Sequence, residues 1–442
     1  MVESHAKISG DNACSIAESV ESLIGSGALA PGAQVPTVRA LAETLSVSPA
    51  TVSAAYRTLR ERGFLISQGR SGTIVNYSPP LRCCSRTRKV PKNSFDLARG
   101  NPDPKLLPKL RPYLDKLDDR PRLYGEELNI VDLVATAKSM FAADGIETSS
   151  VAIVSGALDG LKRTLEAHTR RGDRVIVEDP CFTGIIDVIR VLGLAPIPVA
   201  LDDFGMIPAA LEEALRTRPA AVILTPRAQN PTGAAVNQKR AEELVRVLSK
   251  KPEIFIVEDD HAYGIAGADY FPIASHSAGS WAVIRSVSKS FGPDLRLAFV
   301  AADDLTLSRV EGRQLIAVRW VSHILQQIVL GMCRDKQVDK LLAKAEAAYG
   351  ERREMLKSAL ARYGIKGRGR SGLNVWIPVA EETALCQGLL DQGWSVSAGE
   401  KYRLKSTPGI RVAVAEMTKE RAEKFASDMA ALFAPERITG AA

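Results

Sequence analysis

The stretch SVSKSFGPDLRLA, residues 286–298, follows the apolar run WAVIR and carries one lysine, Lys289, among hydroxyl residues. Four earlier apolar runs also end in polar residues: VAIVSG, DRVIVEDP, AAVILTPR and IFIVEDD. Helical patterns separate several of these runs, which is typical of a buried, largely parallel sheet in an α/β fold. Ligands of such sheets bind beyond the carboxyl ends of the strands, so we expect these polar endings to converge on one site.

Lys289, Ser286, Ser288 and Arg296 together suit a phosphorylated aldehyde as ligand. A lysine amine condenses with an aldehyde, while serine hydroxyls and an arginine bind a phosphate dianion. Desolvation beside Arg296 would lower the pKa of Lys289 and favour the neutral, nucleophilic amine. Taken alone, Lys289 would be interpreted as a surface or phosphate-binding lysine; the order of the other strand endings favours a chemical role.

Each of those four endings supplies a candidate group. SGALDG begins a helix, so the amides of Ala157 and Leu158 can hold a phosphate at a helix N-terminus. Phe182, in EDPCF, can stack on a flat ring or pack in the core. Asn230 offers an amide in the rigid turn NPTG. The run IFIVEDD ends in consecutive carboxylates, which point to opposite faces of the strand, so only one can meet a given ligand.

The first 78 residues follow a different pattern. Apolar residues recur at helical spacing in three segments, with Thr37 and Ser48 as N-caps of the second and third. FLISQGRSGTIVN then alternates like two short strands around a glycine-rich turn. Helix, turn, helix and hairpin in this order predict a winged helix-turn-helix. Its third helix exposes small residues and Arg57, which would let it enter the DNA major groove.

Composition and charge define the remaining organisation. The chain has 442 residues, of which 45% are hydrophobic and 25% charged, so we expect a globular protein of more than one domain. Of the net charge of +7, five units lie in residues 79–93, which hold no acid and are bounded by prolines. We therefore predict a DNA-binding domain at 1–78, a basic linker at 79–93 and a second domain at 94–442. A basic linker could also touch the phosphate backbone of DNA.

Neither a membrane span nor a signal peptide is evident, so we expect a cytoplasmic protein. The six cysteines, including the adjacent Cys83 and Cys84, are interpreted as reduced thiols. No CxxC pair indicates zinc, and we predict no metal site.

Residues 29–75, LAPGAQVPTVRALAETLSVSPATVSAAYRTLRERGFLISQGRSGTIV, resemble the DNA-binding domain of the GntR family. The resemblance implies double-stranded DNA as a partner. It implies DNA contacts from seven residues of the helices and wing: Arg39, Thr51, Ser53, Tyr56, Arg57, Arg70 and Gly72. This chain has Ala50 where many relatives have arginine or asparagine, which leaves no base-reading side chain at that point.

The blocks SGALDGL, EDPCF, NPTG, EDD, SVSKSFGPDLRLA and GIRVAVA, in this order, resemble the fold-type I aminotransferases that bind pyridoxal 5′-phosphate. The resemblance covers residues 95–435 and implies a mostly parallel sheet with a small C-terminal α/β subdomain. It implies that Lys289 is the catalytic residue and forms the internal aldimine, while Asp259 pairs with the pyridine nitrogen. Asn230 would hydrogen-bond the ring hydroxyl, and Phe182 would stack on the ring.

The same resemblance assigns the remaining groups. The cofactor phosphate would be held by Ala157, Leu158, Ser286, Ser288 and Arg296. Arg411, in a short apolar strand, would clamp the α-carboxylate of an amine or amino-acid effector. Tyr124, in RLYGEE, would reach the phosphate across a dimer interface.

One position departs from the aminotransferase pattern. Many relatives have a tyrosine two or three residues after the aspartate, whereas here Asp259 precedes Asp260, His261 and, further on, Tyr263. Either His261 replaces that tyrosine beside Asp259, or Asp260 and Tyr263 form the pair. We prefer Asp259, because VEDD with its first aspartate in use is the commoner arrangement in fused proteins of this kind.

A GntR-like domain joined to an aminotransferase-like domain is the arrangement of the MocR subfamily of bacterial regulators. ARGNPDP, ILTPRAQNPTG and WVSHILQ resemble a branch of it associated with control of vitamin B6 salvage. The resemblance implies a homodimer, an operator with two half-sites, and regulation by pyridoxal 5′-phosphate or by its adduct with an amine or amino acid. The alternative is an active aminotransferase with a secondary DNA-binding role, since Lys289, Asp259 and Arg411 are all present.

Overall fold

The computed structural model describes residues 8–25, 28–61, 63–67, 72–76 and 94–433. The chain has two compact units, with residues 1–89 forming the bulk of the first and residues 90–442 the bulk of the second. The predicted linker with Cys83 and Cys84, and the predicted wing residue Arg70, lie outside the described residues. Among the helices that are described, none is both long and apolar enough to cross a membrane.

The first unit is the predicted winged helix-turn-helix. It consists of α1 (Ala13–Gly25), α2 (Val38–Leu45), α3 (Pro49–Glu61), β1 (Leu65–Ser67) and β2 (Thr73–Val75). Both predicted caps are confirmed: Thr37 Oγ1 accepts from the Ala40 amide at 3.2 Å, and Ser48 Oγ accepts from the Thr51 amide at 3.1 Å. β1 and β2 pair antiparallel, as expected for the wing. The apolar faces of the three helices meet in one core.

An eight-stranded sheet, in the order β4-β11-β10-β9-β8-β5-β6-β7, forms the centre of the second unit. Its strands are β4 (Ala152–Val154), β5 (Arg174–Asp179), β6 (Ala195–Asp202), β7 (Gly205–Met206), β8 (Ala221–Leu224), β9 (Phe255–Asp260), β10 (Trp281–Ser286) and β11 (Ala298–Ala302). All five runs singled out in the sequence are strands. β5, β8, β9 and β10 pair in parallel, and β11 is antiparallel to both of its neighbours, which confirms a mostly parallel sheet.

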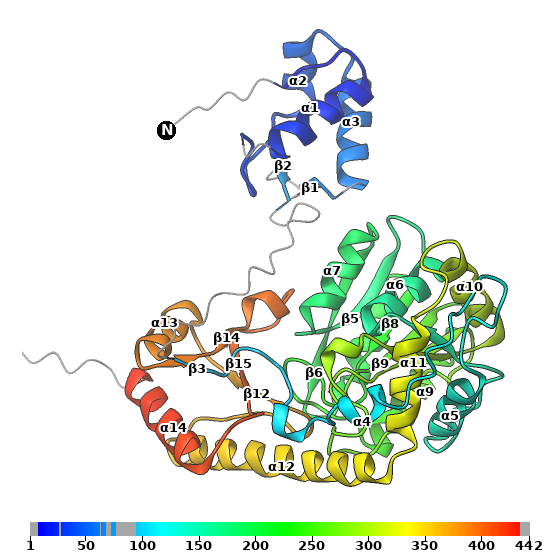
Figure 1. The fold of residues 1–442 in the computed structure, drawn as a ribbon. Coiled ribbons are helices and arrows are strands. Elements are labelled where there is room, and N and C mark those ends of the chain that lie inside the picture. The colour runs from blue at the N-terminus through cyan, green and yellow to red at the C-terminus, as the bar shows by residue number, and fades with distance from the viewer. Residues whose placement is uncertain (1–7, 26–27, 62, 68–71, 77–93, 434–442) are drawn as a thin grey trace, which may run out of the picture. The chain divides into compact units, whose positions relative to one another are not determined.

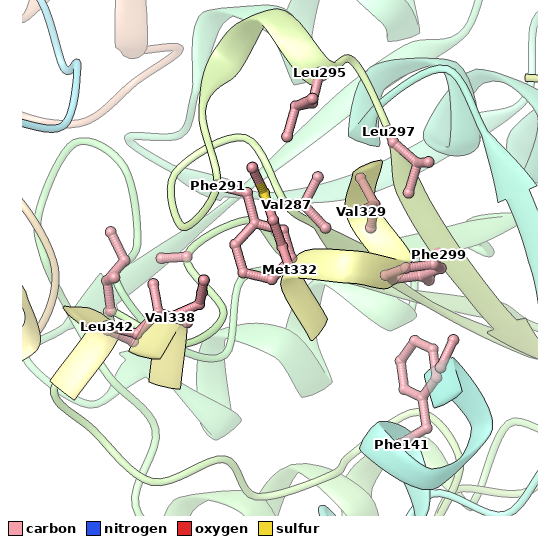
Figure 2. Packing of buried hydrophobic residues seen from close by; sticks show 14 of the residues in the cluster. Phe141, Val287, Phe291, Leu295, Leu297, Phe299, Val329, Met332, Val338 and Leu342 are labelled. Carbon is pink, nitrogen blue, oxygen red and sulfur yellow. The ribbon is translucent and has the colours of Figure 1, made fainter. Parts of the chain in front are cut away.

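Figure 1 shows the helices of the second unit that precede the small subdomain, of which α5, α6 and α10 contact strands of this sheet. They are α4 (Arg111–Leu114), α5 (Val131–Ala142), α6 (Ala157–His168), α7 (Thr183–Val191), α8 (Pro208–Leu215), α9 (Gln238–Leu248), α10 (Asp304–Leu315), α11 (His323–Cys333) and the long α12 (Lys336–Ala361). Figure 2 shows part of the core, where Phe141 of α5 and Met332 of α11 lie near Phe299 of β11. Val287 and Phe291 belong to the same core, so the turn that carries Lys289 is anchored on both sides of the lysine.

The second unit ends in the predicted small α/β subdomain. Its three-stranded sheet is formed by β12 (Asn374–Pro378), β15 (Gly409–Ala413) and β14 (Ser397–Ala398). A second small sheet pairs β13 (Trp394–Ser395) with β3 (Phe95–Asp96), and α13 (Thr383–Asp391) and α14 (Lys419–Phe433) complete the subdomain. The first described residues after the linker are therefore hydrogen-bonded into this subdomain, although they lie about 300 residues away in sequence.

Candidate functional site

Lys289 lies in the turn that follows β10. The Phe291 amide donates to the Val287 carbonyl at 2.8 Å and closes this turn. Lys289 is half-buried, and its Nζ donates to the carbonyl of Gly100. Burial, and secondly the positive charge of Arg411, lower the pKa of Lys289 to about 8. A substantial fraction of this amine is therefore neutral and nucleophilic close to physiological pH.

Asp260, the last residue of β9, is fully buried between two arginines. Arg227 donates to its carboxylate through Nε and Nη2, each at 2.9 Å, and Arg285 Nε donates at 2.8 Å. Burial alone would raise the pKa of Asp260, but the charges of Arg227 and Arg285 lower it to about 2. Tyr263, the predicted alternative partner, packs against the Arg285 guanidinium at 4.5 Å. Asp260 and Tyr263, the alternative pair, therefore each contact an arginine side chain.

Asp259 has different surroundings. It is buried, and its Oδ1 has no hydrogen-bond partner in the described part of the chain. The nearest imidazole nitrogen, His261 Nδ1, lies 3.8 Å from Oδ2. Burial and then the charge of Asp260 raise the pKa of Asp259 to about 7, whereas burial and then the charge of Lys289 lower the pKa of His261 to about 4. A buried carboxylate with an unpaired oxygen fits a cationic N–H donor such as a protonated pyridine nitrogen, and this geometry favours Asp259 over Asp260.

Arg411 brings a buried positive charge to the same cluster. Its Nη1 donates to Asn230 Oδ1 at 3.0 Å and its Nη2 donates to the carbonyl of Ala98. Its Nε is buried without a hydrogen-bond partner, and within the described ranges no carboxylate forms an ion pair with it. Burial lowers the pKa of Arg411. A buried guanidinium without a counter-ion fits an anionic ligand, and a carboxylate matches its forked geometry.

Three of the groups predicted to bind phosphate lie at the start of α6: the amides of Ala157 and Leu158 and the guanidinium of Arg296. The amides of Ala157 and Leu158 are in the first turn, where a helix has no internal acceptors for its N–H groups. Arg296 Nη2 lies 3.5 Å from the carbonyl of Ser155, and a Cβ on Gly156 would lie only 2.6 Å from this nitrogen. Gly156 has a φ of +97°, so both its conformation and the approach of the arginine require glycine. A helix N-terminus beside a guanidinium is suited to an anion.

Phe182 and the two serines lie on neighbouring segments. A Cβ on Gly184 would lie 2.6 Å from the Phe182 ring and 2.9 Å from Leu158, so this glycine allows the ring to approach α6. Ser286 is buried at the end of β10, and its Oγ accepts from the Ser288 amide at 3.2 Å. Ser288 is half-buried in the turn of Lys289.

Tyr124 is not brought to this cluster within one chain. Its side chain is 80% exposed, and its ring packs on Trp320 at 5.6 Å and beneath Arg319 at 5.2 Å. Two apolar residues are also exposed. Leu123 is next to Tyr124 in the sequence, and Ile316 lies shortly before its contacts. The structure therefore leaves Tyr124 on an open apolar surface of the aminotransferase-like unit.

Most predicted DNA contacts are accessible in the first unit. Arg39, Ser53 and Arg57 are exposed, and Thr51 is half-buried with its hydroxyl 2.8 Å from Ser48 Oγ. Gly72 has a φ of +93° in the wing, a conformation that glycine adopts without strain. The exposed face of α3 is thus available for a groove of DNA.

Tyr56 corrects one expectation. Its side chain is buried in the core of the first unit, and its hydroxyl donates to the Pro36 carbonyl at 2.8 Å. Burial raises the pKa of this phenol. Tyr56 lies on the apolar face of α3, and the other residues of this face are also buried. This placement argues against the direct DNA contact that the resemblance implied, and makes Tyr56 a residue that positions α3 from within.

The depressed pKa of Lys289 predicts how cofactor uptake depends on pH. Only the neutral amine attacks an aldehyde, and with a pKa of about 8 roughly one-tenth is neutral at pH 7 and roughly nine-tenths at pH 9. We expect the initial rate of pyridoxal 5′-phosphate uptake to rise about tenfold per pH unit below pH 8 and to level off above it. Stopped-flow absorbance of the apo-protein measures this rate. A rate that still rises tenfold between pH 9 and 10 would show an ordinary lysine instead.

Comparison with known proteins places both units in described families. Residues 134–429 match aminotransferase class I and II, and residues 12–75 match the bacterial regulatory proteins of the gntR family. The chain is 36% identical over 425 residues to the vitamin B6 salvage pathway transcriptional repressor PtsJ of Salmonella typhimurium, covering 96% of this chain and 98% of that protein.

Two further relatives extend the comparison. The HTH-type pyridoxine biosynthesis transcriptional regulator PdxR of Corynebacterium glutamicum is 28% identical over 261 residues, 55% of each chain. Among solved structures, a multiple substrate aminotransferase from Thermococcus profundus superposes with a TM-score of 0.72 at 21% identity, over 79% of this chain and 95% of that chain. At this identity the superposition establishes the fold of the second unit.

Proposed function

Because the chain belongs to the MocR subfamily, in which a gntR-family domain precedes a class I and II aminotransferase domain, we propose that it is a transcription regulator whose DNA binding responds to pyridoxal 5′-phosphate. In this proposal residues 1–78 bind DNA, residues 79–93 connect the domains and residues 94–442 bind the cofactor. A regulator of this kind acts in the cytoplasm, where the DNA is. The names of the Salmonella and Corynebacterium relatives support genes of vitamin B6 metabolism as its targets.

The observation that carries this proposal is the buried, unpartnered Oδ1 of Asp259 in the cluster of Lys289 and Arg411. Pyridoxal 5′-phosphate supplies an aldehyde for an amine and a ring nitrogen that carries a proton. Lys289 Nζ would be the amine that meets the aldehyde, and Asp259 would hold the proton on the ring nitrogen. The α6 N-terminus and Arg296, with Ser286 and Ser288 nearby, would neutralise the phosphate.

The remaining predicted groups would line the same site. Phe182, beside the start of α6, would face the ring, and Asn230, which already contacts Arg411, would meet the ring hydroxyl. His261 stays neutral at pH 7 because of its lowered pKa of about 4, so it can accept or donate one hydrogen bond beside Asp259. Arg411 would hold the carboxylate of an amino-acid effector.

A homodimer is the assembly we propose. Leu123, next to Tyr124, is exposed, and so are Ile316 and Val318, which precede its contacts Arg319 and Trp320 in the sequence. A second copy of the chain would cover this surface, and Tyr124 would then reach the phosphate site of the partner. Two DNA-binding domains per assembly match an operator of two half-sites.

A second candidate function is aminotransferase activity. The presence of Lys289, Asp259 and Arg411 in one cluster favours it, since these groups suffice to attach a cofactor and hold an amino acid carboxylate. Sustained conversion of an amino donor and a keto acid by the purified chain would support this candidate. A protein that binds the cofactor without turnover would support a sensing role alone.

The proposed function is tested by measuring the affinity of the full chain for its own upstream DNA with and without pyridoxal 5′-phosphate. We expect the cofactor to change the dissociation constant by about 5- to 150-fold, the range of typical coupling energies. Arg57→Ala should weaken binding in both conditions by about 1–3 kcal/mol if Arg57 contacts a base, and Lys340→Ala, at an exposed position of α12, should leave binding unchanged. Identical affinity in both conditions would contradict the proposal.

A further inference from the structure

The loop that connects β14 to β15, residues 399–408, leads directly into the strand that carries Arg411. A buried carboxylate of the small subdomain closes the base of this loop. Glu382, just before α13, accepts from the amide of Glu400 at 2.6 Å and from the amide of Gly409 at 2.9 Å. The two ends of the β14–β15 loop are therefore fixed to each other.

A second carboxylate, that of Asp179 at the end of β5, holds the middle of the same loop. Asp179 is buried, and its two oxygens accept four hydrogen bonds from three successive residues. They come from the amides of Leu404 at 2.9 Å, Lys405 at 2.6 Å and Ser406 at 2.7 Å, and from the Ser406 hydroxyl at 2.9 Å. Because the acceptor is ionised, these hydrogen bonds join the large sheet firmly to the small subdomain.

Tyr402 lies in this loop and contacts two parts of the candidate site. Its side chain is buried, and its carbonyl accepts from the amide of Cys181, the residue before Phe182, at 2.9 Å. Its hydroxyl lies 3.0 Å from Ser397 Oγ. The guanidinium carbon of Arg411 lies over its ring, 5.1 Å from the ring centre. Tyr402 therefore connects the turn of Phe182 with the guanidinium of Arg411.

The ring of Tyr402 restricts the orientation of Arg411 without using any of its hydrogen-bond donors. An aromatic ring attracts a guanidinium through its face, whereas the N–H groups of the guanidinium lie in its plane. Two of the nitrogens already donate, to Asn230 Oδ1 and to the Ala98 carbonyl, and the buried Nε has no partner among the described residues. The donor at Nε is thus held in a fixed direction and stays available to a ligand.

On the basis of the proposed function, we propose that Tyr402 is a positioning residue through which the site selects amines that carry a carboxylate, and that Asp179 keeps Tyr402 in place. Without the ring, Arg411 would have to be ordered each time a carboxylate binds, and this cost lowers affinity. A ligand without a carboxylate does not use Arg411, so its affinity is independent of Tyr402. The class of effector that follows is an α-amino acid rather than a simple amine.

Two probes that differ only in the carboxylate, L-alanine and ethylamine, test this inference. Each is titrated into the full chain loaded with pyridoxal 5′-phosphate, and binding is followed by the absorbance of the cofactor. We expect the wild type to prefer L-alanine. Tyr402→Leu should reduce this preference by about 2- to 30-fold, the range that corresponds to cation–π contacts from exposed to desolvated, with the affinity for ethylamine unchanged. Tyr402→Phe keeps the ring and should keep the preference.

Asp179→Asn is the second variant, which remains informative if Tyr402→Leu does not fold. Asparagine presents an NH2 group to the loop amides in place of one carboxylate oxygen, so the preference for L-alanine should fall here as well. Because both probes depend on the same cofactor, the ratio of their affinities cancels any effect of the substitution on the cofactor itself. Tyr363→Leu, which removes an exposed tyrosine of the same unit, should change neither affinity.

Three results would overturn this inference and leave the proposed function intact. They are a wild type that binds both probes equally, a preference that is unchanged in the folded Tyr402→Leu or Asp179→Asn protein, and an equal loss of preference in Tyr402→Phe. A DNA affinity that ignores the cofactor, together with the expected preferences, would contradict the proposed function alone. A wild-type chain that takes up no pyridoxal 5′-phosphate would contradict both.

Discussion

Replacing Lys289 by alanine is expected to abolish covalent attachment of pyridoxal 5′-phosphate and, with it, the effect of the cofactor on DNA affinity. Lys289 Nζ lies in the cluster of Asp259 and Arg411, and its pKa of about 8 makes it far more reactive near neutral pH than an exposed lysine. Borohydride reduction followed by mass spectrometry of peptides detects the attachment. The wild type should show an adduct on the peptide that contains residues 286–298, and the variant should show none.

Lys401→Ala is the matched control. Lys401 is an exposed lysine of the same unit, on the 3-10 helix η4 (Glu400–Tyr402). This variant should keep the adduct, the visible absorbance and the response of DNA binding. An adduct of equal yield at another lysine of the Lys289→Ala protein would contradict the assignment, because attachment would then require no special amine.

Arg285→Ala should destabilise the aminotransferase-like unit by about 3–5 kcal/mol, the usual cost of removing one partner of a buried ion pair. Arg285 is fully buried, binds Asp260 at 2.8 Å and stacks against Phe141 at 4.5 Å. Without Arg285, only Arg227 binds the Asp260 carboxylate, and a cavity opens beside the Phe141 ring. All four tryptophans lie between residues 281 and 394, so urea unfolding followed by tryptophan fluorescence reports on this unit.

Arg334→Ala is the control for the ion-pair effect. Arg334 binds Asp132 at 2.8 Å, but both side chains are more than half exposed, so its removal should cost at most about 1 kcal/mol. Equal destabilisation by the two substitutions would show that burial does not set the strength of the Arg285 network.

The sequence predicted the strand endings well because each depends on local patterning. The runs that became β4, β5, β8, β9 and β10 are short, apolar and followed by polar residues, and the rule for parallel sheets brings those residues together. The caps Thr37 and Ser48 were predictable for the same reason, since a cap bonds within its own helix turn. β6 and β11 were not singled out, although AFVAA is an apolar run that directly follows Arg296 and Leu297.

Contacts between distant segments could not be predicted in this way. The pairing of Arg285 with Asp260 and Asp144 depends on which face of β10 the side chain takes, and nothing local to RSVSK reveals it. The carbonyls of Ala98 and Gly100 carry no side-chain signal at all, and they meet Arg411 and Lys289 across more than 180 residues. The burial of Tyr56 accords with the helical spacing of apolar residues in the third segment, whereas its assignment as a DNA contact rested on the resemblance alone.

The arginines around Asp260 also fix the alignment of β9 with its neighbours. In the observed pairing, Asp259 faces Ile284 and Asp260 faces Arg285 across the β9–β10 ladder. A slip of one residue would turn every side chain of β9 to the opposite face. Asp260 would then turn to the face that Asp259 now takes, Arg227 would lose its buried anion, and Arg285 would keep only Asp144. The charge pairs therefore determine which of the two adjacent carboxylates lies on the face of β9 proposed for the cofactor, a choice that the strand backbone alone would leave open.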